Sequence, residues 1–188
     1  MIDNYIEILY DNEVLESEHI VMRKFKKEDA NDVFEYGSDD ETVKYLEWNG
    51  VKTIEATLKN IVEYYWSKPG IYALELKENK KCIGCIELTV DTDNEKANLG
   101  YVLNKKYWGR GYMTEVLSVL LKLCFEELRL NRVESSHFIG NEGSGRVMKK
   151  CGMLLEGIGI QELKLKGVFC DLAHYGITKN YWEHLNTK

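Results

Sequence analysis

The residues best placed to do chemistry lie in one segment, Tyr107-Trp108-Gly109-Arg110-Gly111-Tyr112-Met113-Thr114-Glu115, between a predicted strand and a long predicted helix. Gly109 and Gly111 lack a Cβ, so the backbone can turn tightly and several N–H groups can converge on one point. The start of the helix adds unpaired N–H groups and the positive end of the helix dipole. The segment therefore predicts a site for an anion such as pyrophosphate, to which Arg110 could add a charge-assisted contact.

Glycine-rich turns before helices also occur in P-loop and dinucleotide-binding proteins, and neither class fits this chain. The sequence contains no Gly-x-x-x-x-Gly-Lys-Ser/Thr motif. Its glycine turn follows several predicted strands, whereas a dinucleotide-binding Gly-x-Gly-x-x-Gly opens a βαβ unit. The role of the glycine segment must therefore be inferred from the strands and helices around it.

The apolar periodicity predicts, in chain order, a strand, two helices, three strands, a helix, a strand, a helix and two strands. This order is typical of an α+β, or mixed α/β, domain with helices packed on one central, largely antiparallel sheet. The expected strands are residues 20–25, 71–76, 81–90, 97–103, 132–138, 155–165 and 169–178, and the expected helices begin after residues 27–29 and near Thr53, Met113 and Gly143.

The composition indicates one folded domain over residues 1–188. Hydrophobic residues make up 44% of the chain and charged residues 30%, and no flexible linker or internal repeat divides it. Residues 1–19 precede the first core strand. We expect them to form an extra N-terminal strand or an arm, which could mediate homodimer formation.

Several partners are excluded by charge and hydropathy. The formal net charge is −6, which argues against nucleic acid as a partner. No stretch of about 18 apolar residues occurs and the N-terminus does not resemble a signal peptide, so we expect a cytoplasmic protein without a membrane partner. The five cysteines suggest reduced thiols. Cys82 and Cys85 are three apart in a predicted strand and should face opposite sides, which argues against a metal site there.

With these elements in place, the sequence resembles the GNAT superfamily of acetyltransferases, and within it the RimJ/RimL-like branch of ribosomal-protein N-terminal acetyltransferases. The resemblance covers roughly residues 20–183. It rests on five motifs in order, namely Leu99-Gly100-Tyr101-Val102-Leu103, the segment from Tyr107 to Glu115, Asn141-x-x-Ser144, Lys150-Cys151-Gly152-Met153 and Glu156-Gly157.

The resemblance implies a GNAT-like sheet with a splayed pair of strands that binds acetyl-CoA as cosubstrate, without a metal. The strand at residues 101–103 would separate from the next one and pair with the pantetheine arm. Trp108 and Met113 depart from the superfamily's usual pyrophosphate loop, and methionine leaves less room beside the ligand. The implied coenzyme-binding residues are Tyr101, Val102, Leu103, Trp108, Gly109, Arg110, Gly111, Tyr112, Met113, Thr114 and Asn141.

The resemblance also implies direct attack of an amine on the thioester, so that orientation, proton removal and oxyanion stabilisation are the tasks of the protein. Asn141 would lie near the pantetheine, and Ser144 could protonate the departing thiolate. Asn-x-x-Ser before a helix is also a plain capping pattern, and that alternative stays open. The backbone N–H of Val102 is the expected donor to the thioester carbonyl.

The base that takes the proton is less clearly marked. An amine with a pKa near ~10 is mostly protonated at neutral pH, so a proton must leave before attack. Glu87 is the first choice, although it could equally be a solvent-facing strand residue; Glu156 and His137 are alternatives. His137 fits a hydrogen-bonded core histidine better, and nothing near Cys151 suggests a nucleophile.

The acceptor is sought in the N-terminal helical region. Glu47 and Trp48 lie in a predicted loop and could bind a cationic amine through charge and ring face. The leading hypothesis is acetylation of a protein N-terminal α-amine. The alternatives are acetylation of a small amine, such as a polyamine or an antibiotic, and a non-catalytic coenzyme-A-binding sensor.

Overall fold

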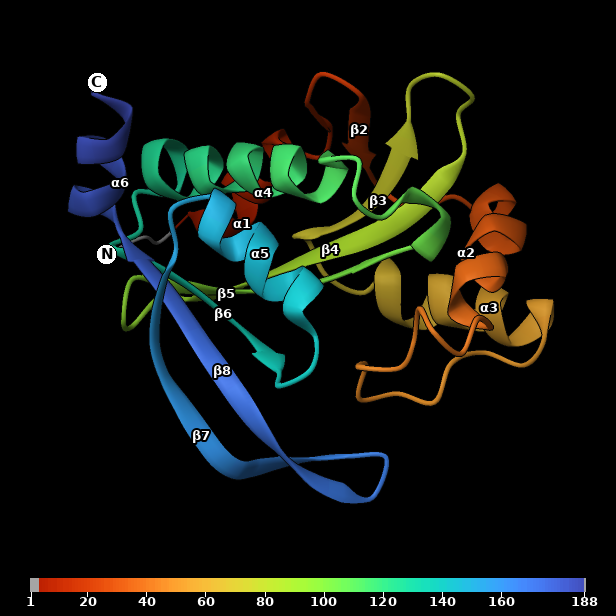
Figure 1. Ribbon diagram of the computed structural model, residues 1–188. Coiled ribbons are helices and arrows are strands. Elements are labelled where there is room, and N and C mark those ends of the chain that lie inside the picture. Colours follow the sequence, from red (N-terminus) through yellow and green to blue (C-terminus); the bar gives the residue numbers. More distant parts are fainter. Residues whose placement is uncertain (1–3, 188) are drawn as a thin grey trace.

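The computed structural model describes residues 4–187 and contains one eight-stranded sheet in the order β1-β2-β3-β4-β5-β6-β8-β7 (Figure 1). All neighbouring strands are antiparallel except β5 and β6. The expected largely antiparallel sheet flanked by helices is therefore confirmed. The strands are β1 (Leu15–Glu16), β2 (Ile20–Arg23), β3 (Ile71–Leu76), β4 (Cys82–Asp91), β5 (Lys96–Leu103), β6 (Arg132–Phe138), β7 (Leu154–Leu165) and β8 (Val168–Thr178).

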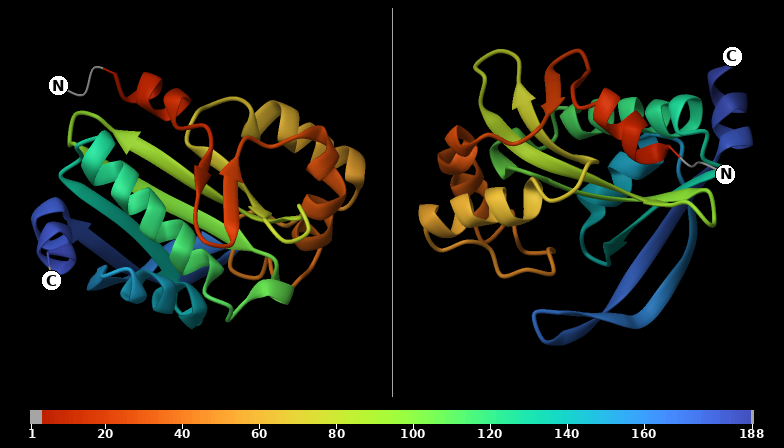
Figure 2. Two further views of the ribbon diagram at one scale, coloured as in Figure 1. Left: turned by 90° about the horizontal axis from the view of Figure 1, so that it is seen from above. Right: turned by 180° about the vertical axis from the view of Figure 1, so that it is seen from behind.

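In the described residues, six α-helices cover the two faces of the sheet (Figure 2). Side chains of α1, α4, α5 and α6 pack in the larger hydrophobic cluster on one face, and those of α2 and the segment after α3 pack in a smaller cluster on the other. The helices are α1 (Tyr5–Asp11), α2 (Ala30–Gly37), α3 (Ile54–Asn60), α4 (Tyr112–Lys122), α5 (Glu142–Lys150) and α6 (Lys179–Asn186).

The predicted long helix is α4, which continues through a π-helical turn over Leu123–Glu127. Its apolar residues Met113, Val116, Leu117 and Leu120 are all buried, because positions spaced by three and four share one face of a helix. The start of α3 is also as predicted. The Thr53 hydroxyl accepts a hydrogen bond from the N–H of Ala56 at 3.1 Å.

The two ends of the chain differ from the sequence prediction. Within the described part of residues 1–19, Leu15–Glu16 form the short strand β1 at the edge of the sheet, and Tyr5–Asp11 form helix α1, which the expected extra strand or arm did not include. At the other end, α6 follows β8 directly and was not predicted. Its Thr178 hydroxyl accepts from the N–H of Tyr181 at 3.4 Å, a capping pattern that the sequence offers.

The strand pair β5–β6 separates halfway along. Pairing runs from Lys96 with Arg132 to Leu99 with Ser135 and ends there, while β4 accompanies β5 as far as Leu103. Residues 100–103 of β5 therefore have a strand partner on one side only. This is the splay implied by the resemblance.

A bulge in β4 corrects the expectation for its two cysteines. The register between β3 and β4 shifts between Ala73 and Glu75, which face Cys85 and Cys82. The extra residue in β4 turns the side chains of Cys82 and Cys85 to the same face of the sheet. Both therefore lie in the same hydrophobic cluster under α2. Burial raises the pKa of both thiols, which makes them unreactive packing residues.

The last two strands, β7 and β8, form a long hairpin that projects from the sheet (Figure 1). Leu165 pairs with Val168, so the turn consists of Lys166 and Gly167 alone. Most of β7 is exposed. Among residues 4–187, no helix has the length and hydropathy needed to cross a bilayer.

Candidate active site

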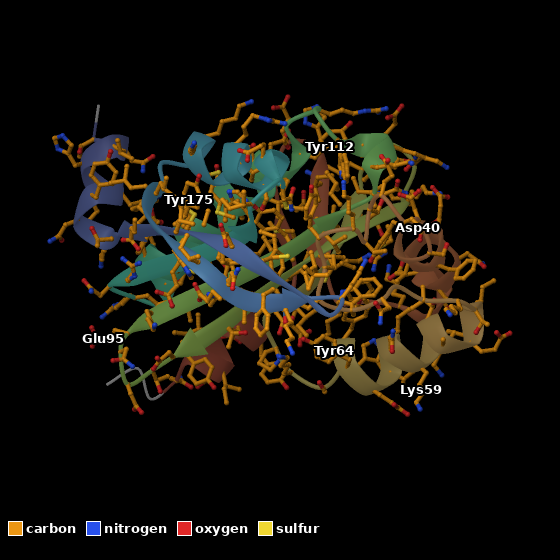
Figure 3. The ribbon with its side chains drawn as sticks, turned by 60° about the horizontal axis from the view of Figure 1, so that its bottom comes forward. Asp40, Lys59, Tyr64, Glu95, Tyr112 and Tyr175 are labelled. Carbon is orange, nitrogen blue, oxygen red and sulfur yellow. The ribbon has the colours of Figure 1, made fainter. Side chains whose placement is uncertain are left out.

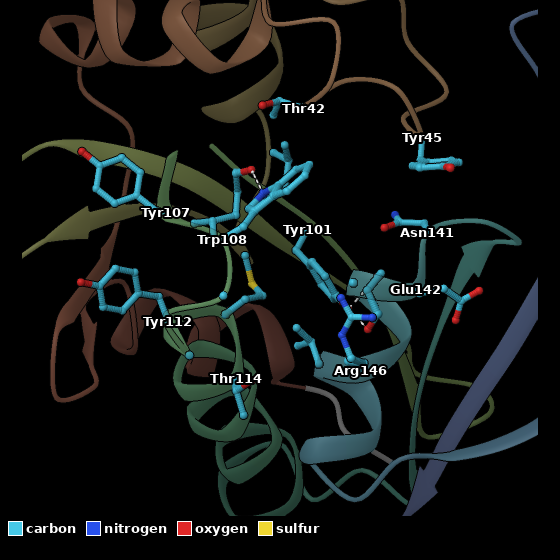
Figure 4. A pocket seen from close by; sticks show the side chains of 18 of the residues that line it. Thr42, Tyr45, Tyr101, Tyr107, Trp108, Tyr112, Thr114, Asn141, Glu142 and Arg146 are labelled. Carbon is cyan, nitrogen blue, oxygen red and sulfur yellow. Dashed lines mark hydrogen bonds between the residues drawn. The ribbon is translucent and has the colours of Figure 1, made fainter. Parts of the chain in front are cut away.

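A first cavity of about 430 Å³ lies between the splayed end of β5, the glycine loop and the start of α5 (Figure 4). Ten of the eleven residues that the resemblance assigned to the coenzyme line it, and Arg110 does not. The guanidinium of Arg110 donates to the carbonyl oxygen of Lys106 at 3.1 Å and lies over the ring of Tyr107. In this structure Arg110 braces the loop from outside.

The glycine loop has the geometry of an anion-binding nest. Gly109 and Gly111 have φ angles of +75° and +88°, a conformation that residues with a Cβ rarely adopt. Within the described chain, the N–H groups of Gly109, Arg110 and Gly111 donate to no protein acceptor. Three free amides next to a helix N-terminus can bind a phosphate or pyrophosphate group.

Glu115, the last residue of the loop motif, holds this nest against the sheet. Its carboxylate accepts hydrogen bonds from the Ser17 hydroxyl at 3.1 Å, the backbone N–H of His19 at 3.2 Å and the His19 ring Nδ1 at 2.9 Å. A carboxylate in the first turn is also favoured by the helix dipole. The sequence did not reveal this role, because its partners lie almost a hundred residues earlier.

Two cations to which the sequence assigned no binding role also line this cavity. Arg146 and Lys150 of α5 line the first cavity, and they are one turn apart on the same helix face. The spacing of four residues between these two cations, in the helix that follows Asn141, was the signal in the sequence that could have identified them. They supply positive charge where the loop supplies amides.

The direction of the β5 backbone corrects one expectation. The N–H of Asn104 donates to the carbonyl of Ile83 at 2.8 Å and so faces β4. Two residues earlier, Val102 must face the same way, and a Cβ on Gly84 of β4 would collide with the Val102 carbonyl. The N–H of Val102 is thus unavailable for a thioester carbonyl.

The groups on the open side of β5 belong to Tyr101 and Leu103. Alternation turns their N–H and C=O groups away from β4, and the Leu103 carbonyl already accepts the indole N–H of Trp108 at 2.6 Å (Figure 4). The indole itself is 51% exposed. Trp108 therefore occupies the carbonyl of Leu103 on the free strand edge, and the N–H groups of Tyr101 and Leu103 remain available to a ligand.

A second cavity of about 590 Å³ lies on the other side of the splay. It meets the first cavity at residues that line both, among them Tyr101, Val102, Asn141 and Ser144. Its lining includes two carboxylates, Glu47 and Glu87, but no lysine or arginine. A cationic ligand would therefore find favourable charge there.

Ser144 and Tyr101 are joined at the junction of the two cavities. The Ser144 hydroxyl donates to the Tyr101 hydroxyl at 2.8 Å, and Tyr101 in turn donates to the Ser144 carbonyl at 3.1 Å. Burial raises the pKa of Tyr101, so its hydroxyl keeps its proton. The side chain of Asn141 does not cap α5, so the capping alternative is wrong for this amide, which lines both cavities.

Glu87 lies in the wall of the second cavity, held by two donors. The Tyr64 hydroxyl donates to one carboxylate oxygen at 2.7 Å, and the Lys68 ammonium is 2.6 Å from the other. Tyr64 belongs to the helical turn after α3 (Figure 3). The hydrogen bond from Lys68 to Glu87 is the main cause of a raised pKa for Lys68, so the ammonium group keeps its charge at neutral pH. Neither Tyr64 nor Lys68 was predicted from the sequence as a partner of Glu87.

The other sequence candidates for proton transfer have structural partners. Glu156 lies outside both cavities and forms a bidentate ion pair with Arg132. His137 is buried, and its Nδ1 donates to the carbonyl of Phe138 at 2.9 Å. Burial raises the pKa of Cys151, which leaves it a poor nucleophile.

Glu47 and Trp48 lie in the loop between α2 and α3 and line the second cavity. The Trp48 side chain is 38% exposed, so its ring is accessible to a ligand. The structure thus brings Glu47, Trp48 and Glu87 to one cavity.

Comparisons with known proteins agree with this geometry. Residues 19–154 match the sequence profile of the family described as "Acetyltransferase (GNAT) domain". Two Bacillus subtilis (strain 168) proteins are similar. "Uncharacterized N-acetyltransferase YoaA" is 29% identical, with 88% of this chain and 97% of the relative covered. "Putative ribosomal N-acetyltransferase YdaF" is 31% identical, with 89% and 95% covered.

A solved structure has the same architecture. The crystal structure of a GNAT-family acetyltransferase from Bacillus anthracis superposes with a TM-score of 0.81 at 28% sequence identity. The match covers 89% of this chain and 99% of the other. The fold and the order of its elements are therefore shared over nearly the whole domain.

Proposed function

This chain belongs to the GNAT family of acetyltransferases, and we propose that it transfers the acetyl group of acetyl-CoA directly to a primary amine, in the first instance a protein N-terminal α-amine. The observation that carries this proposal is the meeting of two cavities at the splayed end of β5. One is lined by an anion-binding loop and by Arg146 and Lys150, with Glu41 and Glu142 also in its wall, and the other has carboxylates and aromatic rings but no lysine or arginine. Donor and acceptor would thus reach the same few residues from opposite sides.

The residues of the first cavity fit acetyl-CoA. The three free amides of the glycine loop, with Arg146 and Lys150, would hold its phosphates. The N–H groups of Tyr101 and Leu103 would hold its amide-bearing arm and polarise the thioester carbonyl. When bound, the coenzyme supplies the acetyl thioester, and no metal is required for such a transfer.

Glu87 is the proposed proton acceptor. Its carboxylate is oriented by Lys68 and Tyr64, and it would attract an ammonium group into the second cavity. Transfer of the proton through a water molecule then produces the neutral amine, which is the nucleophile. Glu47 and Trp48 would bind the rest of the acceptor by charge and ring face.

Ser144 is the proposed proton relay to the leaving thiolate: its hydroxyl would pass a proton to the sulfur and take one up from water, which restores the serine. The Tyr101 hydroxyl accepts from Ser144 and donates to its carbonyl, which fixes the position of the serine hydroxyl. Asn141 lines the same junction with an amide that no protein group in residues 4–187 engages by hydrogen bonding. It would bind the coenzyme arm.

Acceptor chemistry favours an α-amine over a lysine-like amine. An α-amino group with a pKa near ~8 is about one-tenth neutral at pH 7, whereas an alkyl amine near ~10.4 is far below one per cent neutral. The carboxylate of Glu87 in the second cavity is already paired with Lys68. It would accept a proton more readily from an α-ammonium group, whose pKa is lower, than from an alkylammonium group. The name of one relative, "Putative ribosomal N-acetyltransferase YdaF", also supports this acceptor.

Mass spectrometry of products tests the proposal. The protein is incubated with acetyl-CoA and, separately, with ribosomal-protein N-terminal peptides, spermidine and an aminoglycoside. A modified peptide α-amine supports the proposal, and a modified small amine moves the acceptor to that class. If no acceptor is modified while calorimetry shows coenzyme binding, the result favours the alternative of a non-catalytic coenzyme-A-binding sensor.

A further inference from the structure

The second cavity lies between two segments that are distant in sequence. One wall comes from the loop at residues 45–48, between α2 and α3, and another includes Leu163 and Leu172 of the β7–β8 hairpin. Figure 1 shows the tip of the hairpin reaching below this loop. The Lys166 ammonium at the tip donates to the carbonyl oxygen of Val43 at 2.9 Å.

This contact is the one hydrogen bond or ion pair that joins residues 159–170 to the loop at residues 39–52 in the described chain. Val43 is a firm anchor because its side chain is buried and its carbonyl also accepts from the N–H of Leu46 at 3.1 Å. A donor with a full charge makes a stronger hydrogen bond than a neutral one. The tip is thus bound to a fixed point beside the residues that line the cavity.

The rest of the distal hairpin has little to hold it. Its apolar residues are exposed, with Ile160 at 72% and Val168 at 65%. The pairing of β7 with β8 shifts between Gly159 and Leu163, and Gln161 within that shift has a φ angle of +50°. A bulged, weakly packed strand bends more easily than a regular buried one.

The residue type at the tip indicates a purpose beyond turning the chain. Lys166 and Gly167 have φ angles of +50° and +91°, the two positive values of a type I′ turn. Asparagine, aspartate or glycine is favoured at the first of these positions, and lysine is not. The lysine accepts a strained conformation, and its side chain makes the contact across the cavity.

We propose that Lys166 is a positioning residue for the acceptor: by binding the Val43 carbonyl it holds the β7–β8 hairpin against the 39–52 loop and keeps the second cavity formed. The kinetic consequence rests on the proposed acetyl transfer. The closure itself does not, because it is a property of the protein without substrate.

The test compares Lys166→Met, Lys166→Arg and Lys164→Met. Methionine keeps the length of the side chain without the donor, and arginine restores a donor. Lys164 is on the same hairpin, but its ammonium lies over the ring of Phe169 at 4.7 Å and stays within the hairpin, so it is the matched control. All variants are at exposed positions, and their melting temperatures confirm folding.

Hydrogen–deuterium exchange is followed in peptides covering residues 158–170 and 43–48, with β4 as the internal reference. We expect Lys166→Met to exchange about two- to tenfold faster in both peptides, the factor that corresponds to the loss of one hydrogen bond. Lys166→Arg and Lys164→Met should match the parent. Equal exchange in Lys166→Met and Lys164→Met overturns the proposal.

The kinetic probe is a ribosomal-protein N-terminal peptide, whose α-amine is the acceptor of the proposed function. Lys166→Met should raise its KM by about two- to tenfold, again the factor for one hydrogen bond, with kcat and the KM for acetyl-CoA unchanged. An unchanged amine KM despite faster exchange overturns the positioning role. Absence of acetylation by the parent protein counts against the proposed function, while the exchange data still decide the closure.

Discussion

The hydroxyl of Ser144 donates a hydrogen bond of 2.8 Å to the hydroxyl of Tyr101, 43 positions earlier in the chain. Tyr101 comes from the splayed end of β5 and Ser144 from the first turn of α5. The two residues meet where both cavities meet. We therefore expect both hydroxyl groups to affect the rate of acetyl transfer.

Removing either hydroxyl should slow the transfer without weakening coenzyme binding. Ser144→Ala should lower kcat by about 10²-fold, the effect typical of losing a general acid. Tyr101→Phe should lower it less, by about tenfold, because the serine remains but loses its acceptor and its orientation. Steady-state kinetics with acetyl-CoA and the best acceptor measure both. Ser118→Ala, which removes an exposed hydroxyl on α4, is the control, and full kcat in Ser144→Ala would reject the acid role.

Gly111→Ala should weaken coenzyme binding and destabilise the protein together. The residue has a φ angle of +88°, and placing an L side chain there costs about 1–2 kcal/mol. No atom lies within 4 Å of a Cβ built at this position, so the penalty comes from the backbone. Calorimetric binding of coenzyme A and thermal unfolding measure the two effects. Gly157→Ala has equally open space and no positive φ, and an equal loss in that variant would contradict the argument.

Glu87→Gln should reduce kcat/KM for the amine by about 10²-fold at pH 7, the contribution expected of a positioned base. The loss should shrink as pH rises, since the acceptor then loses its proton to solvent. Coenzyme affinity should stay the same, because Glu87 lines only the second cavity. Glu63→Gln, which changes an exposed carboxylate on the helical turn that carries Tyr64, serves as control. A rate deficit that is constant from pH 7 to 10 would argue against a base.

Acid should remove the contribution of Glu35 to stability. A hydrogen bond from Lys81, aided by Asn104 and Lys106, lowers the pKa of Glu35 from an ordinary 4.5 to about 2. A depressed folded-state pKa means that the contribution is present above pH 4.5 and is lost as pH falls toward 2. Glu35→Gln should therefore lower the melting temperature at pH 6 and have a smaller effect at pH 3. A difference that does not change with pH would show that the ionised form is not what stabilises the fold.

Local sequence determined the part of the site that depends on local backbone. Gly109 and Gly111 before an amphipathic helix predict the turn, the free amides and the start of α4, because φ preferences and helix ends are properties of a few neighbouring residues. The alternating strands and the mixed order of elements likewise indicate a largely antiparallel sheet. Helix α6 was missed although Thr178 carries a capping signal, because its short apolar pattern adjoins a strand.

Tertiary structure decided which groups face one another. A one-residue bulge in β4 put Cys82 and Cys85 on the same face of the sheet, where opposite faces were expected. Strand alternation turned the N–H of Val102 away from the splay. No local pattern predicts that Tyr64 and Lys68 hold Glu87, or that Lys166 reaches Val43. Side-chain types and spacing are written in the chain, but the register between strands and the packing of distant segments are set by burial of the whole core, and those determine the contacts in the site.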